Sequence, residues 1–179
     1  MHRTAERGFT LVEIMIVVAI IALLAAVAIP NVLRGRTTAN ESAGIGNLRA
    51  LVSALETERS VNNAYPANAT WQATMYGANC NAGTAPDPDF GPPAFCLTLT
   101  GGGAANTIQG FIYTYAGNAN GDTYTMLVQP GTVGTTGSRS FFVNQTGVVR
   151  HCTAAAGAVG TVGNGPNWRT LDQAPIACT

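Results

Sequence analysis

The sequence predicts an α+β fold in which one long N-terminal α-helix packs on a small antiparallel β-meander. An apolar run fills residues 14–29, and apolar side chains then recur at helical spacing across residues 39–58. Between residues 109 and 151, short runs of aromatic and β-branched residues alternate with turns rich in Gly and Asn. The first half of the helix is apolar enough to span a membrane, and the second half is amphipathic.

Residues 9–29 are predicted to form this membrane-spanning segment. These 21 residues would extend about 32 Å as a helix, which suffices to cross a bilayer. Glu13 is the single acid near the start of this segment. A carboxylate at such a position costs about 2.5–3.5 kcal/mol on insertion scales, so we expect Glu13 to have a function.

The residues Arg7-Gly8-Phe9-Thr10-Leu11-Val12-Glu13, followed by the apolar run, resemble the N-terminal signal of type IV pilins and of type II secretion pseudopilins. The resemblance implies that residues 1–8 are a leader, which a prepilin peptidase removes between Gly8 and Phe9 before Phe9 is N-methylated. It also implies that Glu13 is the acid that this family keeps near the new N-terminus. Paired with the Phe9 amine of its own chain or of a neighbouring subunit, Glu13 can set the register of assembly.

A secretory signal peptide is the alternative for the same residues. Arg3 and Arg7 outweigh Glu6 ahead of the apolar run, and residues 26–28 (Ala-Val-Ala) offer a cleavage site. The product would be a secreted, disulfide-bonded binding domain. Glu13 inside the apolar region and Ile29-Pro30 close behind the cut both argue against it.

Residues 30–66 are predicted to continue the helix beyond the membrane. Pro30 is expected to kink it or to interrupt its hydrogen bonding. Four apolar residues form a stripe that should pack on a sheet of the same subunit: Leu48, Leu51, Val52 and Leu55. Four charged residues are expected largely on other faces: Glu41, Arg49, Glu56 and Arg59. Around the helix end, Ala54-Leu55-Glu56, Asn62 and Tyr65-Pro66 also resemble major pseudopilins and short bacterial pilins.

The rest of the chain is predicted to be a long loop, a sheet and a tail. Residues 67–108 carry many Pro and Gly residues and read as a connection, and residues 109–151 form the sheet. Its strands are expected at 111–115, 124–128, 139–143 and 148–150, with turns at 117–122 and 145–147. Residues 152–179 show little periodicity and resemble the disulfide-closed C-terminal loop of pilins.

The four cysteines, Cys80, Cys96, Cys152 and Cys178, lack the short spacings of zinc or thioredoxin-like sites. They indicate two disulfides in an oxidising compartment, with three possible connectivities. We favour Cys80–Cys96 and Cys152–Cys178, because each pair brackets a Gly/Pro-rich loop. Each closure is worth about 3 kcal/mol in the chain-entropy model.

The sequence indicates no enzyme, metal or cofactor. Residues 118–122 alternate Asn and Asp, but one carboxylate is too few for calcium, so a hairpin turn is favoured. A metal site on Cys152 and His151 is disfavoured, and His151 is expected to be a partly exposed residue beside a disulfide. Beyond residue 60 the basic residues are Arg139, Arg150 and Arg169, which form no stripe for a nucleic-acid backbone.

The resemblance therefore implies a structural subunit of a type IV pilus-type filament. Before assembly it would be a single-pass protein of the bacterial inner membrane, and afterwards part of a periplasmic or extracellular filament. The implied partners are other pilin subunits, the prepilin peptidase, an inner-membrane platform protein, an assembly ATPase and membrane lipid. A type II secretion pseudopilin is the main alternative, although the acidic C-terminal calcium loop of major pseudopilins has no counterpart here.

Overall fold

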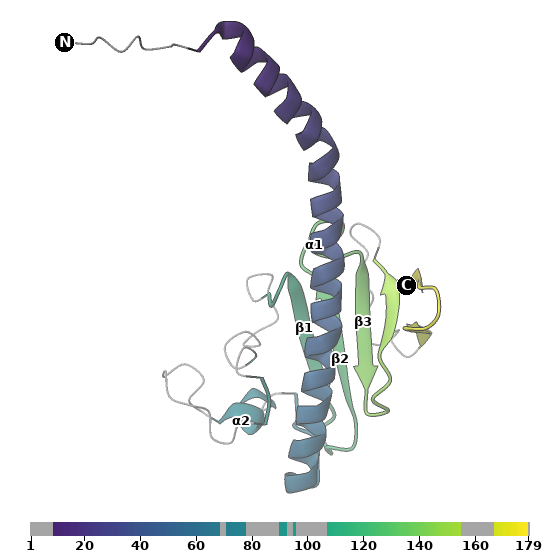
Figure 1. The fold of residues 1–179 in the computed structure, drawn as a ribbon. Coiled ribbons are helices and arrows are strands. Elements are labelled where there is room, and N and C mark those ends of the chain that lie inside the picture. The colour runs from purple at the N-terminus through teal and green to yellow at the C-terminus, as the bar shows by residue number, and fades with distance from the viewer. Residues whose placement is uncertain are drawn as a thin grey trace, which may run out of the picture. The chain divides into compact units, whose positions relative to one another are not determined.

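A computed structural model of the chain describes residues 9–68, 71–77, 90–92, 95, 107–154 and 167–178. The chain divides into two compact units, Met1–Arg36 and Thr37–Thr179, and each is described by itself. The 52-residue helix α1, Leu11–Asn62, contributes to both units (Figure 1). The α+β architecture with a long N-terminal helix is confirmed.

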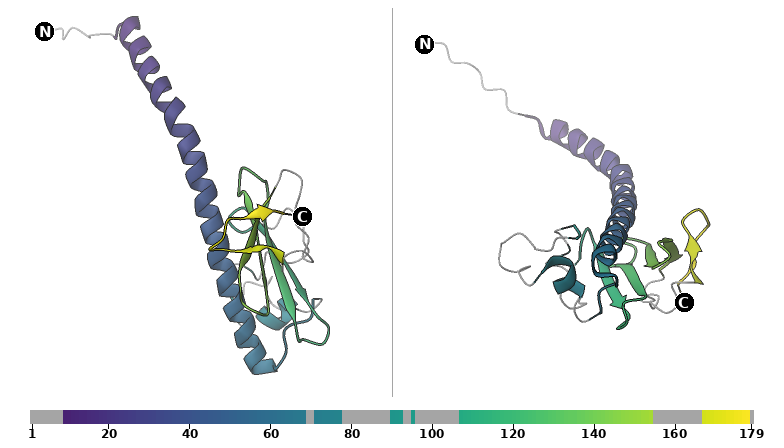
Figure 2. Two further views of the ribbon diagram at one scale, coloured as in Figure 1. Left: turned by 90° about the vertical axis from the view of Figure 1, so that its right-hand side faces the viewer. Right: turned by 90° about the horizontal axis from the view of Figure 1, so that it is seen from below.

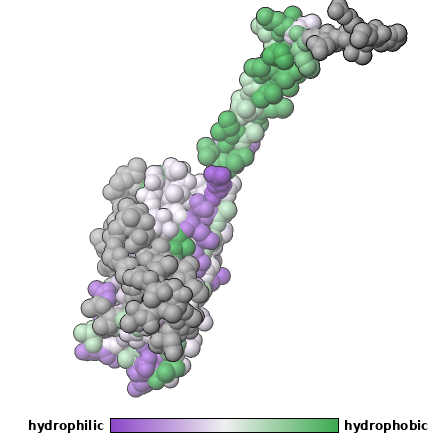
Figure 3. Space-filling view, turned by 90° about the vertical axis from the view of Figure 1, so that its left-hand side faces the viewer, coloured by the Kyte–Doolittle hydropathy of each residue, from purple (hydrophilic) through white to green (hydrophobic). Residues whose placement is uncertain are grey.

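In the first unit, α1 is apolar and has no covering partner among the described residues. Its large apolar side chains, from Phe9 to Leu33, are 50–84 % exposed. Figure 3 shows apolar side chains following one another along this part of the helix. A continuous apolar surface of this extent requires a lipid or protein environment.

Pro30 lies inside α1 and does not end it. Proline has no N–H, and the carbonyl of Ala26 therefore loses its usual helical donor. The side-chain amide of the next residue, Asn31, donates to the carbonyl of Val27 at 3.1 Å, which adds a polar contact to the same stretch.

The helix ends at Asn62, four residues before the expected boundary. Asn63 adopts a left-handed conformation (φ 57°), and its N–H donates to the Arg59 carbonyl at 2.7 Å. Asparagine tolerates this conformation and terminates helices in this way.

The second unit contains a six-stranded sheet (Figures 1 and 2). Four strands form the predicted antiparallel meander in chain order: β1 (Phe111–Gly117), β2 (Tyr124–Pro130), β3 (Arg139–Asn144) and β4 (Arg150–Thr153). The fourth strand begins at residue 150 and not at 148. In the tail, β5 (Arg169–Thr170) pairs antiparallel and β6 (Ile176–Ala177) pairs parallel with β4. Two-residue strands are too short to produce a periodic pattern, so β5 and β6 could not be predicted from the sequence.

The amphipathic stripe of α1 covers one face of this sheet, as predicted. Leu48, Leu51 and Leu55 are fully buried in one cluster with alternate residues of the first strands, including Phe111 and Tyr113. Burying each such side chain contributes about 1.5–3 kcal/mol. A second, smaller cluster joins side chains of the meander to the tail: Leu127, Phe142, Cys152, Ala154, Trp168 and Cys178.

The predicted connection 67–108 contains a helix and part of the core. Helix α2, Trp71–Tyr76, buries Trp71, Met75 and Tyr76, and Phe95 is buried with them. Phe90 donates its N–H to the Met75 carbonyl at 3.0 Å. The many Pro and Gly residues of this segment favoured the prediction of a loop, so the aromatic cluster was not predicted. The proposed Cys80–Cys96 disulfide lies outside the described residues.

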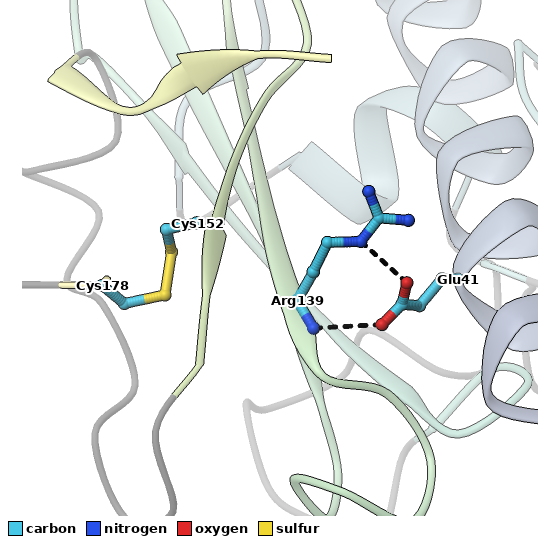
Figure 4. Close-up of a disulfide and its surroundings, with 4 residues drawn as sticks. All are labelled: Glu41, Arg139, Cys152 and Cys178. Carbon is cyan, nitrogen blue, oxygen red and sulfur yellow. Dashed lines mark hydrogen bonds and ion pairs between the residues drawn. A yellow bond between two sulfur atoms is a disulfide. The ribbon is translucent and has the colours of Figure 1, made fainter. Parts of the chain in front are cut away.

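Two polar residues are buried, although Glu41 was expected away from the apolar stripe and His151 was expected to be partly exposed. Glu41 on α1 is 5 % exposed and His151 on β4 is 1 % exposed. Both expectations were wrong because each side chain is paired by residues distant in sequence. The structure joins Cys152 to Cys178 by a disulfide, the pair favoured from the sequence, with Cα atoms 5.0 Å apart (Figure 4).

Candidate assembly segment

The first turn of α1 is closed by a reciprocal pair of contacts between Thr10 and Glu13. The Glu13 N–H donates to Thr10 Oγ1 at 3.2 Å, and the Thr10 N–H donates to Glu13 Oε2 at 3.0 Å. The Thr10 hydroxyl also donates to Glu13 Oε2 at 2.9 Å. This is a capping box, in which two backbone donors at the helix start find side-chain acceptors.

The capping box fixes where the Glu13 carboxylate lies. The carboxylate turns back toward the helix start, where the helix dipole favours a negative charge. Both hydrogen bonds end on Oε2, and within the described residues no hydrogen bond involves Oε1. No structural role was predicted for Thr10, although its Thr-x-x-Glu spacing with Glu13 is sufficient to predict a capping box.

The other residues of the N-terminal signal lie at or before this turn. Phe9 precedes the capping box and is 84 % exposed, whereas Gly8 lies outside the described residues. Between residues 9 and 40, Glu13 is the one carboxylate in the sequence. The chain also contains no lysine, so its only amine is the one at its N-terminus.

By length and composition, α1 can cross a membrane. Its most apolar 18-residue stretch has no residue buried inside the described structure, which distinguishes it from the core helix of a soluble domain. A signal sequence near an N-terminus meets the same criteria, so the span alone does not separate the two interpretations.

In the second unit, α1 is anchored to β3 through Glu41. Glu41 Oε1 accepts from the Ser138 N–H, the Ser138 hydroxyl and the Arg139 N–H at 2.7, 2.8 and 3.1 Å. Glu41 Oε2 forms an ion pair with Arg139 Nε at 2.8 Å (Figure 4). Burial raises the pKa of Glu41, but the donors of Ser138 and Arg139 outweigh burial, and the pKa lies below its ordinary value.

The C-terminal end of α1 is tied to the chain that follows it. The Tyr65 hydroxyl donates to Glu56 at 2.6 Å and accepts from Arg59 at 3.0 Å, whose guanidinium also lies over the Tyr65 ring. The Tyr115 hydroxyl donates to the Pro66 carbonyl at 2.7 Å. Glu56, Tyr65 and Pro66, which belong to the stretch that resembles pseudopilins, therefore stabilise the turn in which the chain leaves α1.

Among the residues that the structure describes, no three His, Cys, Asp or Glu side chains lie close enough together to hold a metal ion. Residues 118–122 form the hairpin turn between β1 and β2, in which the Gly121 N–H donates to the Asn118 carbonyl at 3.1 Å.

Comparison with known proteins places similarity in the first third of the chain. Residues 3–29 match the prokaryotic N-terminal methylation motif. The chain is 38 % identical over 66 residues to the type II secretion system core protein G of Klebsiella michiganensis, covering 37 % of this chain and 46 % of that protein. It is 47 % identical over 62 residues to the type IV wide pilus major component PilA4 of Thermus thermophilus, covering 35 % and 47 %.

A third relative, the type IV major pilin protein PilA of Myxococcus xanthus, is 47 % identical over 60 residues, which are 34 % of this chain and 27 % of that protein. The chain thus matches about half or less of the length of these curated relatives. No solved structure matches the chain.

Proposed function

We propose that this chain, whose first third is of the pilin and pseudopilin type, is a structural subunit of a type IV pilus-type filament. One observation carries the proposal: the described part of the segment that matches the methylation motif is also an apolar helix whose large side chains are at least half exposed, with a carboxylate fixed at its start. We infer that a prepilin peptidase cuts between Gly8 and Phe9 and that Phe9 is then N-methylated.

The apolar half of α1 would serve as membrane anchor before assembly and as filament core afterwards. Lipid tails are as apolar as the helix, so transfer from lipid to a helical bundle gains little from the hydrophobic effect. Close packing and polar contacts must favour the bundle instead. Glu13 is the polar group that this segment offers.

The charge on Glu13 would select the axial position of each new subunit. Cleavage creates an ammonium at Phe9, and an ammonium or a carboxylate left unpaired in lipid is penalised. Because the capping box engages Oε2, Oε1 remains for the amine of a neighbouring subunit. A subunit added at the wrong offset would leave both charges unpaired.

Two variants separate the charge of Glu13 from its capping role. Glu13→Gln removes the charge and keeps a side chain that can complete the capping box. Thr10→Val removes the cap and keeps the charge. Glu13→Gln should be inserted and cleaved but should form few or no filaments, whereas Thr10→Val should assemble. Normal filaments built from Glu13→Gln subunits alone would refute the pairing.

Carbodiimide cross-linking offers a direct readout of the same pair. Because the chain has no lysine, the cleaved subunit has one amine, at Phe9. Coupling a carboxylate to an amine in intact filaments should yield oligomers whose linked peptides join Glu13 of one subunit to Phe9 of the next. Oligomers linked through other carboxylates, with none through Glu13, would contradict the assigned partner.

We further propose partners and a location that follow from filament assembly. These are other copies of the subunit, the prepilin peptidase, a platform protein and an assembly ATPase at the bacterial inner membrane. The names of the pilin and pseudopilin relatives support other copies of the subunit as partners, and the match to the methylation motif supports the peptidase. Depletion of the ATPase should leave cleaved subunits in the inner-membrane fraction.

A type II secretion pseudopilin is the second candidate. Several relatives bear the name core protein G, at identities comparable to those of the pilins. Deletion of the gene distinguishes the two: loss of surface fibres under the electron microscope supports a pilin, and retention of secreted proteins in the periplasm supports a pseudopilin.

A further inference from the structure

The apolar half of α1 ends in a groove that combines apolar side chains with one cation. The groove is lined by Ala28, Ile29, Val32, Leu33 and Arg36, and all five are exposed. Their spacing places them on one face of the helix. Within the described residues, Arg36 has no hydrogen-bond or ion-pair partner. An apolar groove that ends at a guanidinium suits a ligand with an apolar body and an anionic head.

The length of the helix determines where this groove meets a membrane. The segment from Phe9 to Arg36 would extend about 40 Å as a helix. A bilayer measures about 40–45 Å across when its headgroups are included. With Phe9 at one surface, Arg36 therefore reaches the headgroups of the opposite surface. The apolar residues of the groove then lie beside the ends of the acyl chains that are nearest to those headgroups.

The charges along α1 indicate which kind of molecule can pair with Arg36. Arg34 and Arg36 are the only charged residues between Glu13 and Glu41. Glu13 lies about 34 Å away along the helix, and Glu41 is buried in an ion pair within its own subunit. The same segment of a second copy therefore offers no carboxylate to Arg36. The headgroup region offers phosphate, which a guanidinium can bind through two oxygens at once.

We propose that this groove binds one anionic phospholipid, with its phosphate on Arg36 and an acyl chain along the four apolar side chains. The inference rests on the membrane anchoring proposed above. An anionic lipid is preferred because no amine in its headgroup competes for the phosphate. Arg34 lies about 200° around the helix from Arg36 and faces away from the groove. The lipid stabilises the subunit before assembly, because the contact is lost when the helix leaves the membrane.

Vesicle flotation tests the anchoring separately from the lipid site. The cleaved chain should float with vesicles of phosphatidylcholine alone and with vesicles that also contain phosphatidylglycerol. A chain that floats with neither kind of vesicle would contradict the anchoring, and the lipid site with it. A chain that floats with both but has no preferred lipid would contradict the lipid site alone.

Native mass spectrometry of the cleaved chain, released from detergent micelles, measures this preference. The micelles should contain phosphatidylcholine and phosphatidylglycerol in equal amounts and with the same acyl chains. We expect one bound phosphatidylglycerol, about fivefold more abundant than bound phosphatidylcholine. Arg36→Gln should reduce the phosphatidylglycerol adduct about fivefold, and Arg36→Lys should reduce it less because the charge is kept.

Arg34→Gln is the matched control, because it removes the same charge at nearly the same depth but on the other side of the helix. It should reduce the adduct less than about twofold. Equal losses in Arg34→Gln and Arg36→Gln would indicate diffuse attraction and would overturn the site. Displacement of the lipid by millimolar inorganic phosphate would show that the phosphate alone is recognised. A dimer in place of the lipid adduct would show that a second copy occupies the groove, and either result would contradict the proposal.

Discussion

Replacing Glu41 by Gln should destabilise the second unit, although Glu41 was expected on a helix face away from the apolar stripe. The carboxylate accepts three hydrogen bonds on Oε1 and binds Arg139 through Oε2. Glutamine keeps one acceptor but directs an amide donor toward the guanidinium. Breaking a buried ion pair costs about 3–5 kcal/mol, and the 30 % exposure of the Arg139 side chain reduces this to about 2–3 kcal/mol.

Tryptophan fluorescence of the cleaved chain in detergent can measure this loss. Trp71 and Trp168 are both buried in the second unit, so their emission reports its unfolding. The midpoint should fall by about 4–12 °C, given about 2–4 °C per kcal/mol for a domain of this size. The control Arg49→Gln, at an exposed position of α1, should change the free energy of unfolding by less than about 0.5 kcal/mol.

The pH dependence of this difference provides an independent check. A carboxyl whose pKa is lowered in the folded state stabilises the fold at pH values above its pKa in the unfolded state. This contribution is lost as the pH falls through the pKa of the folded state. The difference between Glu41→Gln and the parent should be full at pH 7 and should shrink below the ordinary pKa of 4.5. Equal midpoints at pH 7 would refute the assignment of Glu41 as an anchor.

Three further predictions use the same unfolding assay. Gly46→Ala should stabilise by about 0.5–1 kcal/mol, because a Cβ there meets nothing within 4 Å and alanine favours the helix. Gly121→Ala (φ 73°) should lower the free energy of unfolding more than Gly134→Ala (φ 84°) does, because the new Cβ at residue 121 would lie 2.5 Å from the Cβ of Ala64. The Cβ at residue 134 meets open space, so only about 1–2 kcal/mol of backbone strain is expected there. Equal losses of stability in the two variants would contradict the steric argument. Burial raises the pKa of Glu58, so its ionisation destabilises the fold as the pH rises above 4.5, and Glu58→Gln should therefore be more stable than the parent at pH 7 but not at pH 4.

The parts of the fold that local periodicity determines could be predicted from the sequence. Residues 111–115 alternate in burial along β1, and Leu48, Leu51 and Leu55 are spaced to form one helix face. The Thr-x-x-Glu spacing of Thr10 and Glu13 also has a local cause, and a search for capping boxes would have found it.

The parts that depend on distant partners could not be predicted. Glu41 is buried because residues 97 and 98 positions later supply its donors, and the helical pattern alone places it with exposed charges. His151 is buried because a tail residue 22 positions later covers it. Trp71 and Phe95 join the core from a segment whose Gly and Pro content indicated a loop.

The N-terminus of the subunit tests the central claim most directly. Intact-mass analysis with terminal peptide sequencing should be made on the protein isolated from its native membranes or filaments. We predict a chain that begins at Phe9 and carries one N-terminal methyl group, which the match of residues 3–29 to the methylation motif supports. A chain that begins at Ile29, after cleavage at the Ala-Val-Ala site, would lack the whole apolar segment and would contradict the account.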